Sequence, residues 1–151
     1  MNVGQLCQRT VVTVQPGDEI AMAARLMREK HVGFLVVVEP AAQESEVVPV
    51  GVITDRDIVV STIARDVDPK SLRVGDVMTR NPTVTLDCES TADAVSQMRH
   101  RGVRRLPVVG SYGHLIGVIS LDDILTRSAD EIGAAAAVIT KGRDIESQTR
   151  N

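Results

Sequence analysis

The stretch that decides the fold reads Gly51-Val52-Ile53-Thr54-Asp55-Arg56-Asp57-Ile58, and it recurs as Gly117-Val118-Ile119-Ser120-Leu121-Asp122-Asp123-Ile124. In both copies a short apolar run, typical of a buried strand, ends at a hydroxyl residue. An aspartate follows three positions later, and this spacing is typical of a capping box at the start of a helix. The motif therefore predicts the same strand-to-helix turn twice in one chain.

The repetition extends outward from this motif over most of the chain. A shift of 71 positions brings residues 3–38 onto residues 74–109 without a gap and gives eleven identities in 36 positions. Beyond that the shift falls to 66, so the first copy carries five extra residues, which we expect in a surface loop around residues 40–45. The chain is therefore an internal duplication.

Each copy predicts the element order β-α-β-β-α. The elements are expected at residues 11–14, 18–30, 34–38, 50–53 and from 55 in the first copy, and at 83–86, 90–101, 105–109, 115–119 and from 121 in the second. Asp18 is expected to cap the first helix, and Ser90 to open its counterpart through a capping box with Asp93. The pattern predicts an α+β fold of two small units packed together.

The predicted boundaries follow from the repeat. We expect a first repeat at residues 1–66, a linker at 67–73, a second repeat at 74–140 and a polar, fraying tail at 141–151. An apolar stripe at helical spacing runs through the last helix, from Leu121 to Ile139. This stripe either packs on its own domain or forms an interface between subunits.

Composition and charge exclude several classes of partner. The net charge is −3, from 17 basic and 20 acidic residues, so no basic surface for nucleic acid or acidic membranes is expected. Phe34 and Tyr112 are the only aromatic residues, which argues against modules that stack bases on aromatic rings. No apolar run reaches the ~20 residues of a membrane span, and the first residues lack the features of a signal peptide. We therefore expect a cytoplasmic protein with Cys7 and Cys88 reduced, although a disulfide between them is also open.

Catalytic and metal-binding motifs are missing from the sequence. His31, His100 and His114 have no metal-ligand spacing with either cysteine and are expected to be ordinary surface or loop residues. No glycine-rich phosphate loop, nucleophile elbow or acidic pair at catalytic spacing occurs. The sequence therefore predicts a protein that is not an enzyme and that requires neither a metal nor a cofactor.

The polar pairs of the repeated motif, Thr54 with Asp57 and Ser120 with Asp123, allow two interpretations. In the first they only cap the helices that follow. In the second, each aspartate also accepts two hydrogen bonds from a vicinal diol such as a ribose, while the hydroxyl group and the free amides at the helix start bind a phosphate. The two uses are compatible, because a capping hydroxyl group can still face a ligand.

These motifs resemble a tandem pair of CBS domains (the cystathionine β-synthase type of regulatory repeat), often called a Bateman module. The resemblance covers about residues 3–127. Besides the repeated motif, it is carried by Val74-Gly75-Asp76-Val77-Met78-Thr79 and by Val103-Arg104-Arg105-Leu106-Pro107-Val108-Val109. It implies two repeats related by a pseudo-twofold axis, with clefts that bind adenosyl compounds (AMP, ADP, ATP, NAD or S-adenosylmethionine) in a regulatory role.

The resemblance also implies roles for individual residues. Asp57 and Asp123 would bind the ribose hydroxyl groups, and Thr54 and Ser120 would approach the phosphate or the ribose. The residues implied at the adenine are Thr10, Val32, Gly33, Asn81 and Val103.

The two copies differ in their basic residues. The second copy has Arg104 and Arg105 where the first has Gly33 and Phe34, and in some nucleotide-binding relatives basic residues at these positions meet phosphates. Conversely, the first copy has Arg56 inside its motif. We expect these three arginines to bind phosphate and to give clefts of unequal affinity, since charge-assisted hydrogen bonds are strong. The alternative is that the arginines of the second copy are solvated charges at a strand edge.

The leading hypothesis is a stand-alone, bacterial-type regulatory module that signals to an unidentified partner protein by a ligand-dependent conformational change. The resemblance implies a homodimer whose second helices pair through the apolar stripes Ile58-Val59-Ile63 and Ile124-Leu125-Ile132. The alternative hypothesis is a constitutive dimerisation or protein-docking module with vestigial clefts.

Overall fold

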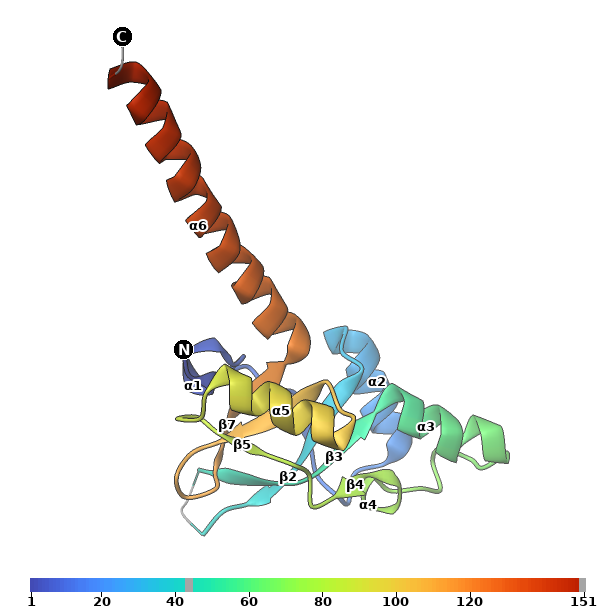
Figure 1. Ribbon diagram of the computed structural model, residues 1–151. Helices are drawn as coiled ribbons and strands as arrows, with labels where there is room; N and C mark the ends of the chain where they lie inside the picture. The colour runs from blue at the N-terminus through green and yellow to red at the C-terminus, as the bar shows by residue number, and fades with distance from the viewer. Residues whose placement is uncertain (43–44, 150–151) are drawn as a thin grey trace.

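Two small β-sheets form the centre of the molecule and helices cover them (Figure 1). The computed structural model describes residues 1–42 and 45–149, with side chains as far as residue 145. In chain order the elements are α1 (Val3–Leu6), β1 (Thr13–Val14), α2 (Ile20–Lys30), β2 (Phe34–Pro40), β3 (Val47–Thr54), α3 (Asp55–Ser61), the 3-10 turn η1 (Ile63–Arg65), α4 (Val74–Val77), β4 (Thr79–Arg80), β5 (Thr85–Leu86), α5 (Thr91–Arg101), β6 (Arg105–Val109), β7 (Leu115–Ser120) and α6 (Leu121–Thr149). The predicted α+β class and the β-α-β-β-α order of each repeat are confirmed.

The sheets of the two repeats have the same pairing. β1 lies parallel to β2 and β5 parallel to β6, while β2 with β3 and β6 with β7 form antiparallel hairpins. The five extra residues of the first copy lengthen its hairpin, because β2 runs on to Pro40 and β3 begins at Val47. Residues 43 and 44 of the expected insertion lie outside the described residues.

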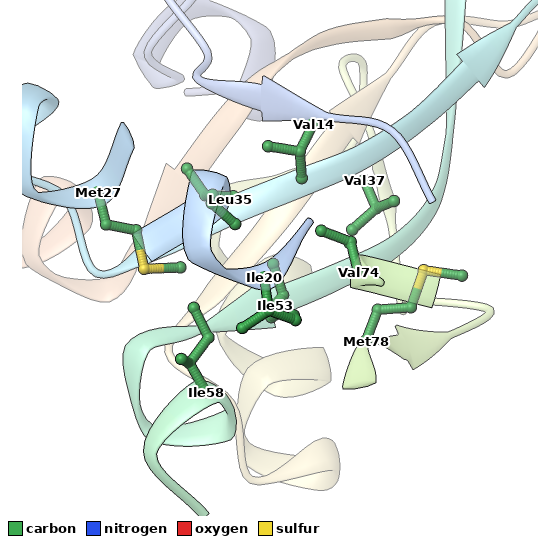
Figure 2. Packing of buried hydrophobic residues seen from close by; sticks show 10 residues of the cluster. Val14, Ile20, Met27, Leu35, Val37, Ile53, Ile58, Val74 and Met78 are labelled. Atoms are coloured by element: carbon green, nitrogen blue, oxygen red, sulfur yellow. The ribbon is translucent and has the colours of Figure 1, made fainter. Parts of the chain in front are cut away.

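Each repeat has its own core of aliphatic side chains. In the first, α2, α3 and the strands bury Ile20, Leu35 and Ile53 completely, as Figure 2 shows. In the second, Leu106 and Ile119 hold the matching positions. Burying one such side chain contributes roughly 1.5–3 kcal/mol, so these clusters stabilise each unit without aromatic residues.

The short helix at the start of each repeat packs against the core of the other repeat. Val74 of α4 and the following Met78 complete the core of the first repeat, and Val3 of α1 lies in the core of the second. The amide groups of Val3 and Gly4 donate to the carbonyl oxygens of Glu89 and Asp87, across the two repeats. The repeats are therefore interlocked at both ends.

A glycine of the repeated motif makes room for this exchange. A Cβ atom at Gly117 would lie 2.7 Å from the Gln8 carbonyl oxygen, where the entering segment pairs with Val118 of β7. A Cβ atom at Gly51 would lie 2.6 Å from the Met78 sulfur atom, next to the point where β4 pairs with β3. Gly51 and Gly117 thus permit the close crossing that joins the repeats.

Three local predictions are wrong or only partly met. The N-cap of α2 is Glu19 and not Asp18, because the Asp18 carboxylate accepts a hydrogen bond from the Gln15 amide and closes the preceding turn instead. Ser90 caps α5 as expected, but its hydroxyl group also donates to the Asp93 carboxylate, so the reciprocal bond of a capping box is absent. The first strand of each copy is confined to two residues.

The last helix is longer than predicted. α6 begins at Leu121, as expected, but continues through the proposed tail to Thr149, since Gly142 costs a helix only about 1 kcal/mol and no proline stops it. Residues 150 and 151 of the tail lie outside the described residues. Ile124 packs into the core of its own repeat, whereas Leu125 and the described side chains beyond it are exposed. α6 projects away from the body of the molecule (Figure 1). None of the described helices is long and apolar enough to cross a membrane.

Candidate functional site: two clefts between the repeats

One cleft, here called the Asp123 cleft, lies where the start of the first repeat meets the end of β7. It has a volume of about 370 Å³. Its first wall comes from repeat 1 and includes Gln8, Thr10, His31, Val32, Gly33 and Phe34. Its second wall comes from repeat 2 and includes Arg105, Val118, Ser120, Asp122 and Asp123.

The second cleft, here called the Asp57 cleft, has a volume of about 660 Å³. Thr54, Asp55, Arg56 and Asp57 line it from the end of β3 and the start of α3. Thr79, Asn81, Arg101, Val103, Arg104 and Arg105 line it from the second repeat and the segment leading into it, and Gly33 and Phe34 line it as well.

All twelve residues singled out in the sequence line one of the two clefts. The structure brings Thr10, Val32 and Gly33 together with Ser120 and Asp123 in one cleft. It brings Asn81, Val103, Arg104 and Arg105 together with Thr54, Arg56 and Asp57 in the other. Each cleft therefore combines the expected base-side residues of one repeat with the expected ribose-side residues of the other. That these residues bind a ligand stays a prediction.

The motif aspartates are held by the capping boxes that the sequence predicts. Thr54 ends β3 in an extended conformation and caps α3, where its Oγ1 accepts from the Asp57 amide at 3.1 Å. The Asp57 carboxylate in turn accepts from the Thr54 amide at 2.9 Å. Ser120 and Asp123 make the same exchange, with an additional bond of 2.5 Å from the serine hydroxyl group to the carboxylate. Each box fixes one carboxylate oxygen and orients the side chain at the cleft.

The expectation of free amides for phosphate at the start of α3 is wrong. The Thr54 and Asp57 amides are used by the capping box, the Asp55 amide donates to the Gly33 carbonyl oxygen, and the Arg56 amide donates to the Asp55 carboxylate. Phosphate binding in the Asp57 cleft would therefore depend on side chains.

Asp123 differs from Asp57 in its second oxygen. The Gln8 side-chain amide donates to Asp123 Oδ1 at 3.1 Å, across the boundary between the repeats. Burial raises the pKa of Asp123, but the hydrogen bonds from Ser120 and Gln8 and the charge of Arg105 outweigh it and hold the pKa below its ordinary value. Thr79 takes the place of Gln8 in the Asp57 cleft, and no hydrogen bond joins it to Asp57 among the described residues. Asp123 is thus kept charged and fixed from both repeats.

The clefts also differ in charge. Among the described residues, four exposed arginines and two aspartates line the Asp57 cleft, whereas one arginine and two aspartates line the Asp123 cleft. Arg104 and Arg105 are therefore both solvated, as the alternative interpretation expects, and located at a cleft.

Arg105 and Phe34 belong to both clefts. The Arg105 guanidinium lies over the Phe34 ring, with its central carbon 6.0 Å from the ring centroid, and both side chains line both clefts. Phe34 and Arg105 are the two positions that the 71-residue shift superposes. This stacked pair forms a wall that the two clefts share.

Sequence reasoning missed Gln8, Phe34 and Arg101 as cleft residues. Gln8 lies two positions before Thr10, and in an extended segment residues two apart face the same side, so alternation from Thr10 could have found it. Arg101 occupies the last turn of α5 before the left-handed Gly102, and no motif marks it.

Outside the two clefts, His100 lines a further hollow of about 540 Å³ together with Glu89 and Asp93. No group of three or more His, Cys, Asp or Glu side chains that could hold a metal ion occurs in the part of the chain that the structure describes. Cys7 and Cys88 are unbonded thiols, and burial is the main cause that raises the pKa of Cys7. His31 lines the Asp123 cleft, and His114 lies in the turn between β6 and β7, with its Nδ1 3.9 Å from a Glu46 carboxylate oxygen.

Sequence comparison settles the family. The sequence model of the CBS domain matches residues 3–61 and again residues 74–130. The chain belongs to the CBS domain family. An uncharacterized protein of Methanopyrus kandleri is 32% identical over 126 residues, which cover 83% of this chain and 61% of that protein. The CBS domain-containing protein YhcV of Bacillus subtilis is 32% identical over 133 residues, which cover 85% of this chain and 86% of that protein.

Solved structures of CBS proteins share this fold. A CBS domain protein of Pyrobaculum aerophilum, complexed with AMP, matches with a TM-score of 0.70 and 26% identity, over 82% of this chain and 89% of that one. A hexameric CBS-CP12 protein from bloom-forming cyanobacteria matches with a TM-score of 0.70 and 30% identity, over 83% of this chain and 66% of that one. The resemblance inferred from the repeated motif is therefore confirmed.

Proposed function

We propose that this CBS domain pair is a regulatory module that binds one adenosyl ligand in each cleft and passes the bound state to a partner protein. The observation that carries the proposal is the matched construction of the clefts. In each, an aspartate oriented by a hydroxyl residue of one repeat faces the base-side residues of the other repeat.

The clefts offer the groups that a nucleoside needs. A carboxylate oxygen has two lone pairs, so the oxygen of Asp57 that the cap does not use can accept from both ribose hydroxyl groups. The equivalent oxygen of Asp123 already accepts from Gln8 and offers one lone pair. Val32 and Val103 supply apolar surface for a base, and Phe34 adds an aromatic face to both clefts. The AMP complex of the Pyrobaculum aerophilum relative supports this class of ligand.

Charge assigns different ligands to the two clefts. The arginine-rich Asp57 cleft favours ADP or ATP, because guanidinium groups bind phosphate oxygens strongly. The Asp123 cleft, with Asp122 beside Asp123 and one arginine, favours AMP or an adenosyl compound without phosphates, such as S-adenosylmethionine.

A ligand in either cleft touches both repeats and would therefore fix their relative position. Asp123 is the third residue of α6, so a ligand bound to it acts directly on the first turn of the projecting helix. Occupancy of the Asp57 cleft would reach the same region through Arg105, which both clefts share. We infer that α6 carries the signal, since a rigid helix transmits a change at its first turn along its whole length.

The proposal is tested by asking what the purified protein carries. The protein is denatured, and any released small molecule is identified by mass spectrometry. Since it has one tyrosine and no tryptophan, a bound nucleotide should dominate its ultraviolet spectrum. The emptied protein is then titrated by calorimetry with AMP, ATP, NAD and S-adenosylmethionine.

We expect an adenosyl compound to be released, or at least one of the four to bind. If none binds to the folded protein, the adenosyl proposal is wrong. A stable assembly without ligand would then favour the alternative role as a constitutive dimerisation or docking module.

A further inference from the structure

The projecting part of α6 is a surface that the clefts do not explain. The family match ends at residue 130, while α6 continues to Thr149. From Leu125 to Ile145 every residue is exposed, and the helix extends away from both cores (Figure 1). At 1.5 Å per residue, the part beyond Leu125 is about 36 Å long.

One face of this projecting part follows a seven-residue repeat. Leu125, Ile132 and Ile139 are spaced by seven and are 58%, 71% and 60% exposed. Ser128, Ala135 and Gly142 are also spaced by seven and lie three positions after them. This alternation places large aliphatic side chains at one core position of a coiled coil and small residues at the other.

Large and small residues in alternation suit a close pairing of two helices. In an antiparallel pair the two core positions meet across the interface, so each large side chain packs opposite a small residue of the partner. Ile132 of one helix then faces Gly142 of the second helix, and Ile139 faces Ala135 of the second helix. In a parallel pair each layer would hold two large or two small residues and would leave gaps at Gly142.

The charged side chains of the helix lie outside this face. At helical spacing Asp130 and Lys141 fall on the opposite side, and Glu131 pairs with Arg127 of the same helix, with 3.2 Å between Nε and Oε1. The face itself carries no charged residue from Leu125 to Gly142, as the core of a helix pair requires.

We propose that the projecting part of α6 pairs antiparallel with the same helix of a second copy of this chain, centred near Ala137. The contact begins at Leu125, inside the matched residues, and continues along the part of α6 beyond residue 130 that the family model does not cover. It would join two CBS pairs end to end. A membrane surface suits this helix less well, because Asp130 and Glu131 interrupt its polar face, whereas membrane-bound helices carry mainly lysine and arginine there.

Distances between spin labels test the arrangement in the full chain. Cys7→Ser with Cys88→Ser removes the native thiols, and a single cysteine for the label is introduced as Ala137→Cys or as Thr126→Cys. Ala137 lies near the proposed centre on the outward side, and Thr126 lies near one end. Because both positions face outward from the pair, we expect a label separation of about 25 Å at residue 137 and of about 40 Å at residue 126.

A second pair of variants tests the surface itself. In the background labelled at 137, Ile132→Asp with Ile139→Asp should eliminate the short distance, while Ala134→Asp with Thr140→Asp, on the opposite side of the helix, should retain it. Unchanged thermal unfolding of the globular part shows that the variants fold.

The proposal is overturned if no distance between copies is found at residue 137, or if the labels at 126 and 137 are equally close. It is also overturned if the aspartates at 132 and 139 leave the short distance unchanged. None of these outcomes depends on ligand in the clefts, so the proposed function is tested separately.

Discussion

The Asp57 cleft and the Asp123 cleft are built from the same motif in two copies, yet they present different chemistry. The backbone frame is shared, because each aspartate is the third residue of its helix and exchanges bonds with the hydroxyl residue that caps it. The side chains around the frame have diverged, with four arginines at one cleft and one at the other. The comparison teaches that duplication preserved the turn that positions the aspartate, while neighbouring positions set the charge that a ligand meets.

The largest expected effect comes from the aspartates themselves. Asn retains a carbonyl oxygen for the cap but loses the charged carboxylate, so Asp57→Asn separates ligand binding from helix capping. We expect it to weaken ATP binding about a hundredfold, the value of two charge-assisted hydrogen bonds, and to leave AMP binding at the other cleft unchanged. Calorimetry measures both affinities.

Asp66→Asn is the matched control, because this exposed aspartate follows η1 and lies at neither cleft. Unchanged ATP affinity in folded Asp57→Asn would mean that the carboxylate is a cap only.

The next effect concerns the arginines that distinguish the clefts. Arg101→Ala with Arg104→Ala should reduce ATP affinity at the Asp57 cleft about tenfold, less than the full value of desolvated pairs since both arginines are exposed. AMP affinity should change much less, because AMP has fewer phosphate oxygens for them to bind. Arg99→Ala, on the same helix but not lining the cleft, is the control. An equal loss for AMP and ATP would show that these residues do not select for phosphate number.

A substitution that adds a positive charge to the Asp123 cleft tests the same comparison in the opposite direction. Asp122 occupies the position that Arg56 holds in the first copy, and both line their clefts. Asp122→Arg should raise the ATP affinity of the Asp123 cleft about fivefold, through roughly 1 kcal/mol of added attraction. Asp122→Ala shows how much of the gain comes from removing the acidic group alone. If Asp122→Arg raised the ATP affinity no more than Asp122→Ala does, the positive charge would not be what favours ATP.

The smallest effect is a pH dependence of stability that comes from Asp123. Its pKa is lower in the folded protein than in the unfolded chain, so its charged form stabilises the fold above the unfolded pKa, and this contribution disappears as the pH falls through the folded pKa. Because this carboxylate is partly exposed and solvent screens its interactions, Asp123→Asn should lower the free energy of unfolding near pH ~7 by less than about 1 kcal/mol, and by still less near pH ~3. Urea unfolding at the two pH values measures the difference. If Asp123→Asn lowered the free energy of unfolding by the same amount at both pH values, the charge of Asp123 would not be what stabilises the fold.

Much of the fold could be predicted from the sequence because the duplication marks each element twice. The apolar runs and the Thr/Ser-x-x-Asp spacing located the central strands, and both second helices begin where that spacing placed them. The predicted Asp18 cap is wrong because the Asp18 carboxylate accepts from the Gln15 amide in the preceding turn. The residue types alone do not show which of these two hydrogen bonds an aspartate makes. The exchange of α1 and α4 between the repeats was also invisible, since it depends on contacts between Val3 and Val74 and distant residues.

The clefts could be predicted as sets of residues but not as two separate sites. The motif named Asp57 and Asp123, and the 71-residue shift named their equivalents, yet only the three-dimensional crossing of the repeats shows which base-side residue faces which aspartate. Phe34 escaped notice because its place opposite Arg105 depends on the packing of the repeats. Arg101 was missed because its helix ends at the Asp57 cleft, a fact of packing and not of spacing.

The central claim is that one chain holds two unequal adenosyl sites, and a competition titration tests it most directly. ATP is added to the wild-type protein at one equivalent per chain, enough to fill the Asp57 cleft, and AMP is then titrated in a calorimeter. The account predicts that AMP still binds, at one site per chain, because ATP fills the Asp57 cleft in preference to the Asp123 cleft. Complete exclusion of AMP by ATP, or a total of one nucleotide per chain, would contradict it.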